Sequence, residues 1–306
     1  MTRGVFLRGI ILCLFLCQLV AANTCESEEL SVSIYAGGDE RRTELHQGEA
    51  FLIYIEMNEQ TMVQVRGTFA GKDVPFLPAR QGKVWYALLG IDLNMVPGRY
   101  PIALEIGFPE GVRRKFKVII PVRDREFPEE HLTLPRKMTE LDEAALKRVR
   151  DDSAAFSKIW SQKSNERFLN GSFERPVPGD VTSGFGLRRV INGEPKSPHT
   201  GQDLRAASGE AVRAANAGRI VMVRDCFFSG KSVVIDHGSG IYSMYFHLSE
   251  YKVKPGDKVE KGQVIGQAGM TGRSTASHLH WGFRLLGARV NPDSVMALAP
   301  LLDKLQ

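Results

Sequence analysis

Hydrophobic and polar residues alternate most regularly in the stretch from Ser277 to Leu285. On a strand, side chains two positions apart share a face, whereas on a helix they lie about 200° apart. As a strand, this stretch has a polar face that includes His278 and His280. Its other face is apolar throughout: Leu279, Trp281, Phe283 and Leu285. The pattern predicts a strand that packs one face in a core and presents two histidines on the other.

The N-terminal part of the chain also shows the pattern of short strands. Each apolar run there is bounded by Gly, Pro, Asn or Asp, which are typical turn residues. The runs are 30–35, 51–56, 62–68, 84–89, 100–106 and 114–120. Strands of this length and spacing predict an immunoglobulin-like β-sandwich over residues 23–123. This part carries no cluster of nucleophile, base or ligand residues.

Residues 124–172 differ in character, with prolines, many charges and one apolar stripe at helical spacing. Thr139 can cap a helix, and acidic residues follow it in the first turn. The stripe consists of Leu141, Ala145, Val149, Phe156 and Trp160. We predict a linker with one amphipathic helix, whose stripe packs on a neighbouring domain as core rather than as a binding site.

From Phe173 onward the chain is again rich in β-forming residues and in glycine. The predicted strands are 182–188, 218–224, 232–236, 241–247 and 264–268, and a helical region follows at 293–304. We therefore predict a mainly β protein, with residues 173–306 as a second β domain.

The first 22 residues have the features of a secretory signal peptide. Arg3 and Arg8 precede an apolar run that starts at Gly9 and ends in Val20-x-Ala22, a small-residue cleavage signal before Asn23. The run is shorter than the roughly 20 residues that a membrane span needs. We expect export with no stable membrane insertion after cleavage, although an uncleaved anchor remains an alternative.

Composition narrows the classes of function. The chain has 306 residues and a formal net charge of +5, and no Lys/Arg run is dense enough for a nucleic-acid patch. Without the signal peptide, Cys25 and Cys226 are the only cysteines. A single disulfide and two free thiols are both compatible with this pair, but a disulfide framework is excluded.

Five of the seven histidines lie in the C-terminal part: His199, His237, His247, His278 and His280. His199 precedes Asp203 by four residues, and Pro198 and Gly201 indicate a turn that runs into a strand. Alone, His-x-x-x-Asp carries little information. Together with the His-x-His strand, it gives ligands of the types His, Asp and His, which with an open fourth position are typical of catalytic zinc.

These motifs resemble peptidase family M23, the LytM-type zinc metallopeptidases, over residues 173–295. Further matching motifs are Phe185-Gly-x-Arg188, Asp236-His-Gly238, Val253-x-x-Gly-Asp-x-Val-x-x-Gly-Gln-x-Ile-Gly266 and Thr271-Gly-x-Ser274. The resemblance implies a LytM-type antiparallel β-sheet, or barrel-sandwich, peptidase domain. It makes His199, Asp203 and His280 the ligands of one zinc ion per chain. His247 and His278 become the acid–base pair, with His278 as the expected base.

The same resemblance implies a function. We expect a secreted zinc metalloendopeptidase that hydrolyses peptide crosslinks of peptidoglycan, with D-Ala–diaminopimelate as the favoured bond. A zinc-bound water would attack the amide with help from histidine. The partners would be peptidoglycan peptide stems, in the periplasm or cell envelope.

Two other functions and one regulatory hypothesis remain beside this expectation. Some M23-like proteins lack the metal and activate other wall hydrolases, but this chain retains all five positions. Residues 253–269 also resemble a biotinyl or lipoyl hairpin, yet they lack the lysine that such a carrier needs at its tip. Autoinhibition by residues 124–172 is a hypothesis based on the charged linker and helix directly upstream. Asp236 and His237 are expected to be turn and packing residues.

Overall fold

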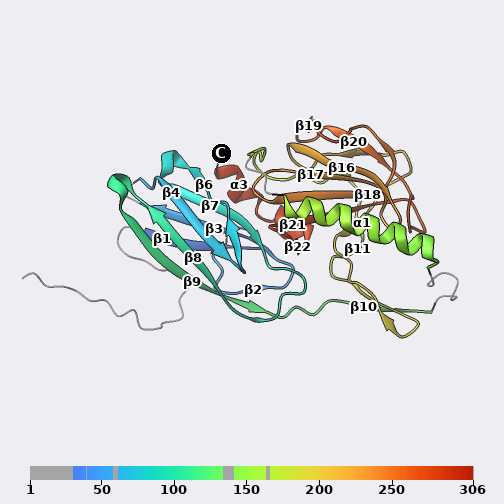
Figure 1. Cartoon of the computed structure of the whole chain (residues 1–306), viewed down its shortest axis with the longest axis horizontal. Coiled ribbons are helices and arrows are strands. Elements are labelled where there is room, and N and C mark those ends of the chain that lie inside the picture. The colour runs from blue at the N-terminus through green and yellow to red at the C-terminus, as the bar shows by residue number, and fades with distance from the viewer. Residues whose placement is uncertain (1–29, 39, 58–60, 134–140, 163–165, 306) are drawn as a thin grey trace, which may run out of the picture.

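A computed structural model describes residues 30–38, 40–57, 61–133, 141–162 and 166–305, and the fold is mainly β (Figure 1). The predicted signal peptide, Cys25 and Thr139 lie outside these residues. Within them, no helix combines the length and the apolar character that crossing a membrane requires.

Two antiparallel sheets form the N-terminal sandwich, which is the name used below for β1 to β9. The four-stranded sheet has the order β1 (Leu30–Tyr35), β3 (Ala50–Met57), β7 (Val84–Gly90) and β6 (Leu77–Ala79). The five-stranded sheet has the order β2 (Leu45–His46), β9 (Arg113–Arg123), β8 (Gly98–Gly107), β4 (Gln64–Phe69) and β5 (Lys72–Val74). Among the described strands of this sandwich, only β2 pairs in parallel, with β9. Apolar residues such as Phe51, Ile53 and Ile102 fill the space between the sheets. The immunoglobulin-like assignment stays a prediction.

The C-terminal sheet has ten strands. Its main path runs β11 (Val181–Ser183), β14 (Gln202–Arg205), β21 (His278–Leu285), β18 (Ile241–Tyr251), β17 (Gly230–Asp236), β16 (Gly218–Cys226) and β19 (Lys258–Val259). β15 (Ala211–Arg213), β20 (Val264–Ala268) and β22 (Ala288–Val290) pair off this path. The predicted alternation of β21 is confirmed, because Leu279, Trp281 and Phe283 are fully buried on its apolar face.

One prediction of element boundaries was wrong. Residues 182–188 are not one strand, because β11 ends at Ser183 and β12 (Arg188–Ile191) belongs to a separate small sheet with β13 (Glu194–Pro195). The residues between them turn, with Gly186 at φ 83°. The helical region predicted at 293–304 is confirmed, and it consists of two short helices, α2 (Pro292–Met296) and α3 (Ala299–Lys304).

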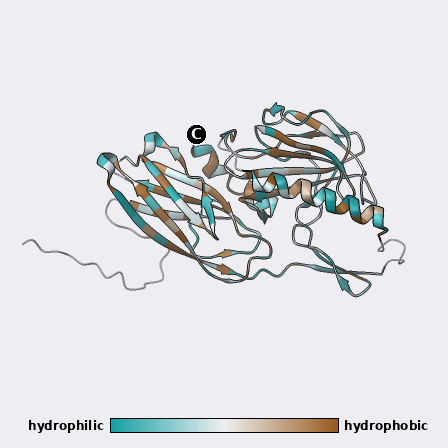
Figure 2. Ribbon diagram, in the orientation of Figure 1, coloured by the Kyte–Doolittle hydropathy of each residue, from teal (hydrophilic) through white to brown (hydrophobic). Residues whose placement is uncertain are grey.

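The N-terminal sandwich shares a hydrophobic core with the C-terminal sheet. Ala50, Leu52 and Leu88 of the four-stranded sheet belong to the same buried cluster as Phe283 and Leu285. Brown, hydrophobic ribbon runs through both regions in Figure 2. A two-point ion pair also joins them, since Arg289 donates to both carboxylate oxygens of Asp92 at 2.6 and 3.0 Å. The sandwich is thereby fixed on the apolar side of β21 and leaves the histidine side to other elements.

Two elements between these regions lie beside the C-terminal sheet (Figure 1). β10 (Glu129–Leu132) pairs in parallel with β12. The helix α1 (Glu143–Ser161) packs against β16. It begins after Asp142, whose carboxylate accepts the Ala145 N–H. Phe156 and Trp160 of the predicted stripe pack, half-buried, against the C-terminal sheet, and the fully buried residues of α1 are Asp152 and Ile159, which the stripe did not include.

Candidate metal centre and active site

Strand pairing brings two of the three predicted ligands together, Asp203 and His280. β14 runs antiparallel to β21, with Asp203 directly opposite His280 and Arg205 opposite His278. Directly opposed residues on neighbouring strands lie on the same face and within contact distance. His199 lies in an irregular segment that leads through a bend at Gly201 into β14. The face of the C-terminal sheet that carries His278 and His280 is called the histidine face below.

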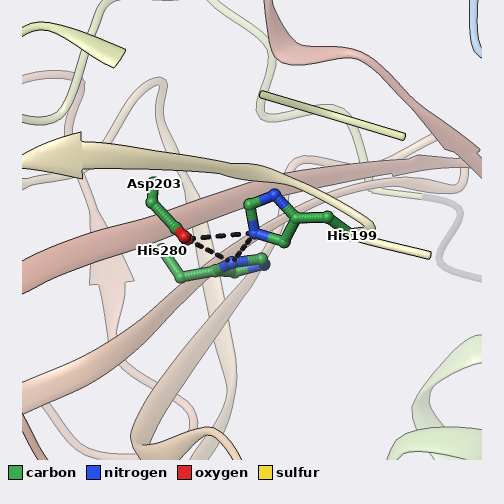
Figure 3. Close-up of side chains that lie close together, drawn as sticks. All are labelled: His199, Asp203 and His280. Atoms are coloured by element: carbon green, nitrogen blue, oxygen red, sulfur yellow. Dashed lines mark hydrogen bonds and ion pairs between the residues drawn. The ribbon is translucent and has the colours of Figure 1, made fainter. Parts of the chain in front are cut away.

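Three donor atoms converge on this face, and we call their residues, His199, Asp203 and His280, the donor triad (Figure 3). His199 Nε2 lies 2.9 Å from His280 Nδ1 and 3.0 Å from Asp203 Oδ1. His280 Nδ1 lies 3.0 Å from the same Asp203 oxygen. The three atoms thus form a nearly equilateral triangle.

The protonation of the donor triad favours a cation at the triangle. His199 Nδ1 lies 2.8 Å from the Gly184 carbonyl, which can only accept, so the neutral ring carries its proton there and presents a lone pair at Nε2. Burial lowers the pKa of His280 to about 4, so its ring is neutral at pH 7. Burial of Asp203 opposes ionisation, but contacts with His199 and His280 outweigh it and hold the carboxyl pKa well below its usual range.

The geometry also fits a tetrahedral ion. Ligand atoms about 2.1 Å from a tetrahedral zinc ion are about 3.4 Å apart, close to the edges of the donor triangle. The set of two imidazoles and one carboxylate is typical of catalytic zinc, with one position left for water or substrate. The donor triad can therefore hold a metal ion without rearrangement of the strands.

His247 reaches the same face through an irregularity in β18. Regular alternation would direct it to the core side with Tyr245, but the pairing of β17 with β18 shifts between Tyr245 and Leu248, and His247 has φ 63°. Such a bulge re-aims a side chain, and a positive φ outside glycine is a conformation found often at functional sites. The ring centroid of His247 lies 4.8 Å from that of His278 and 6.2 Å from that of His280.

His247 and His278 are oriented alike by backbone carbonyls. His247 Nδ1 lies 2.8 Å from Thr271 O, and His278 Nδ1 lies 2.9 Å from Ala276 O. Each neutral ring therefore carries its proton on Nδ1 and has its lone pair on Nε2. His278 Nε2 lies 3.6 Å from Asp203 Oδ1, which places a proton acceptor next to the donor triad. Burial lowers the pKa of His247, which keeps that ring neutral as well.

The structure thus brings all five predicted site residues to one face, and it adds groups that the sequence did not reveal. The ring of Phe246 stacks on that of His280, with centroids 5.2 Å apart and planes 4° from parallel. A Cβ on Gly201 would lie 2.6 Å from His280 Nε2, so only glycine lets the turn pass this close to the ring. Phe246 directly precedes His247 in the sequence, which is a signal for its position near the site. The carbonyl partners of the histidines and the close contact at Gly201 leave no signal in a single sequence.

Asp236 and His237 do not join the site, as predicted. His237 is buried, with Nδ1 2.7 Å from Ala217 O and Nε2 2.7 Å from Ser243 Oγ. Asp236 accepts the Gly238 N–H in the turn between β17 and β18. Both residues are fully used in packing and turn formation.

A β-sheet with a His/Asp/His donor triad beside two further histidines defines a metallopeptidase-type centre. Comparison with known families agrees, because residues 197–292 match the model of peptidase family M23. Residues 197–292 are therefore similar to peptidase family M23.

Several proteins of known sequence or structure are similar to this chain. The peptidoglycan DD-endopeptidase ShyA of Vibrio cholerae is 39% identical over 127 residues, which are 40% of this chain and 30% of ShyA. The DD-carboxypeptidase/endopeptidase Mpg of Neisseria meningitidis is 42% identical over 124 residues, or 40% of this chain and 29% of Mpg. A solved structure described as a peptidase M23 from Pseudomonas aeruginosa is 28% identical and covers 80% of this chain and 92% of its own, with a TM-score of 0.60. The chain thus spans about a third of the length of these two curated relatives, but most of the length of the solved structure.

Proposed function

We propose that the chain is a zinc-dependent metalloendopeptidase that hydrolyses peptide crosslinks of peptidoglycan. The observation that carries the proposal is the donor triad, with three lone-pair donors about 3 Å apart, next to a histidine whose free nitrogen faces them. Burial lowers the pKa of His280 and keeps that imidazole neutral, which is the form that binds metal, and the Ala276 carbonyl holds the proton of a neutral His278 ring on Nδ1.

The residues of the site divide into two functions. The donor triad, His199, Asp203 and His280, would hold one zinc ion. When bound, such an ion acts as a Lewis acid and lowers the pKa of a water toward about 7. His278 accepts a proton at Nε2, because Ala276 O fixes the N–H on the opposite side of the ring. His247, held in the same way by Thr271 O, steadies the oxyanion or the leaving group.

The substrate follows from the relatives. ShyA is named as a peptidoglycan DD-endopeptidase, and Mpg as a DD-carboxypeptidase/endopeptidase. We extend this to the present chain as cleavage of the D-Ala–diaminopimelate crosslink, in the periplasm or cell envelope, after export directed by residues 1–22. On this proposal residues 23–123 are an immunoglobulin-like domain, 124–172 a helical linker and 173–306 the peptidase domain. A non-catalytic regulator would have no need of the complete donor triad.

Digestion of purified peptidoglycan sacculi tests the proposal. The chain lacking residues 1–22 is incubated with sacculi, with a chelator, and with zinc restored after chelation, and the fragments are analysed by mass spectrometry. We expect crosslinked dimers to become monomers, a loss of cleavage with chelator, and recovery with zinc. Asp203→Asn should be inactive, whereas Asp180→Asn, at an exposed carboxylate outside the site, should match the unmodified chain. Cleavage that persists in Asp203→Asn would refute the proposed centre.

A further inference from the structure

Arg205 lies on the histidine face, next to the proposed proton acceptor. It is the last residue of β14 and is paired with His278 of β21, just as Asp203 is paired with His280. Leu204 between the two is fully buried, so Asp203 and Arg205 both point to the opposite side of the sheet. The row of side chains that supplies a predicted metal ligand therefore continues into an arginine.

The backbone of Arg205 is held at both edges of β14. One edge pairs with β21, and at the other edge the Arg205 N–H donates to the carbonyl of Asp180 at 2.8 Å. Gly179 passes so close that a Cβ there would overlap the Arg205 carbonyl oxygen. The side chain of Arg205 thus starts from a rigid strand, which is what a group that positions a substrate requires.

The guanidinium of Arg205, by contrast, is exposed. Among the residues that the structure describes, no carboxylate, carbonyl or aromatic ring lies within interaction distance of it. Arg284, further along β21 on the same face, is half-buried, donates to Gly287 O and lies 4.8 Å above the Trp160 ring. The Arg205 donors are therefore free beside the site, and the planar guanidinium fork pairs best with a carboxylate.

The crosslink proposed above carries a carboxylate that this arginine can reach. In a D-Ala–diaminopimelate bond, the carbon attached to the amide nitrogen also bears a free carboxyl group. That carboxyl carbon lies two bonds from the nitrogen, about 2.5 Å away. Arg205 is the next residue on the same face after Asp203, about 6.6 Å along β14, a distance that an extended arginine side chain spans. An amide held at the donor triad therefore places the carboxylate within reach of the guanidinium.

We propose that Arg205 is a specificity residue that binds the free carboxylate of the diaminopimelate residue next to the scissile amide. The inference rests on the proposed peptidase function, and it narrows the substrate to crosslinks in which this carboxyl group is not amidated. The ion pair also fixes the direction in which the amide crosses the donor triad, with its nitrogen on the side of Arg205.

The test compares Arg205→Gln with Arg66→Gln in the chain that starts at Asn23. Both changes remove one exposed arginine from a strand, but Arg66 lies on β4 of the N-terminal sandwich. Two soluble muropeptide dimers serve as substrates, one with the free diaminopimelate carboxylate and one in which this carboxyl group is amidated. The kcat/KM for each dimer, the zinc content and thermal unfolding are measured for each protein.

The expected result is an effect that depends on the substrate. Arg205→Gln should lower kcat/KM for the free-carboxylate dimer about 10- to 100-fold, with zinc content and thermal unfolding unchanged, because one charge-assisted ion pair is lost. It should leave kcat/KM for the amidated dimer unchanged, and Arg66→Gln should match the unmodified chain with both dimers. Arg205→Lys should recover part of the loss, since lysine keeps the charge but not the fork.

A third dimer tests which carboxylate the arginine binds. The stem peptides also carry a free carboxylate on D-glutamate, so this dimer is amidated at glutamate alone. We expect it to be cleaved like the free-carboxylate dimer and to remain sensitive to Arg205→Gln. If the sensitivity disappears with this dimer instead, Arg205 binds the glutamate carboxylate and the proposal is overturned.

The outcomes separate the two proposals. The specificity role is overturned, and the proposed function stands, if the unmodified chain is active but Arg205→Gln loses zinc, slows both dimers equally or slows neither. If the unmodified chain with zinc bound cleaves none of the dimers, the proposed function fails, and the inference fails with it. A loss confined to dimers with the free diaminopimelate carboxylate supports both.

Discussion

Two buried histidines on opposite sides of the C-terminal sheet have the same pKa and different roles. Burial lowers the pKa of both His237 and His280 to about 4. Both of the ring nitrogens of His237 are occupied by ordinary partners, Ala217 O and Ser243 Oγ. His280 Nδ1 instead faces a carboxylate and the lone pair of His199. Neither burial nor a shifted pKa therefore identifies a metal centre; the chemistry of the partner atoms does.

The cluster around His237 is a closed network of hydrogen bonds. Ser243 Oγ lies 2.9 Å from Tyr245 Oη, which accepts the Ala215 N–H at 2.8 Å. Hydroxyl groups can both donate and accept hydrogen bonds, so the polar atoms of this network satisfy one another without a ligand. In the donor triad two ring nitrogens and a carboxylate oxygen lie 2.9 to 3.0 Å from one another, and a metal ion can accept a lone pair from each of the three. The four predictions below separate these two clusters.

The largest effect is expected at the donor triad. His199→Ala or His280→Ala removes one of three protein ligands, so bound zinc should fall from one per chain to near zero and hydrolysis should drop by at least about 10³-fold. Metal analysis and sacculus digestion measure the two effects. His131→Ala, at an exposed histidine of β10, serves as control. Zinc that stays at one per chain would show that these residues are not the ligands.

The next effect separates proton transfer from metal binding. His278→Ala should keep zinc at one per chain and lower kcat by about 10²- to 10³-fold, because it removes the proton acceptor beside the donor triad. KM should change little. Loss of zinc in this variant would place His278 among the ligands instead.

The third effect concerns stability and not chemistry. His237→Ala leaves a cavity and removes the partners of Ala217 O and Ser243 Oγ, so urea unfolding should show a loss of about 3 kcal/mol. The folded variant should still bind one zinc. A stability equal to that of the unmodified chain would mean that the network is not structural.

The smallest effect is a slope against pH. The folded pKa of His237, about 4, lies below the ordinary value of 6.5, so between these pH values only the unfolded chain binds the proton. Stability without metal should therefore be independent of this group above pH 6.5 and fall by up to about 1.4 kcal/mol per unit as pH decreases toward 4. His237→Gln should remove that part of the slope. Equal slopes in both proteins would contradict the buried neutral ring.

Sequence patterns were sufficient for features that depend on local periodicity. The alternation in β21 could be predicted because strand faces follow from the order of residues, whereas the five site residues were assigned through the resemblance to peptidase family M23. The packing of α1 was only partly predicted, because a buried aspartate such as Asp152 does not fit an apolar pattern. Its burial is explained only by its contact with Arg224. The pairing of β10 with β12 and the carbonyls behind each histidine depend on long-range contacts, which one sequence does not encode visibly.

The bulge at His247 has a consequence for protein engineering. A strand normally offers every second residue to a given side of its sheet, which limits how many functional groups neighbouring strands can supply there. One additional residue in β18 overcomes this limit, since Phe246 and His247 follow each other in the chain and both reach the histidine face. A designer who wishes to add a base to a β-sheet metal centre could therefore insert a single residue next to the ligand strand instead of lengthening a loop.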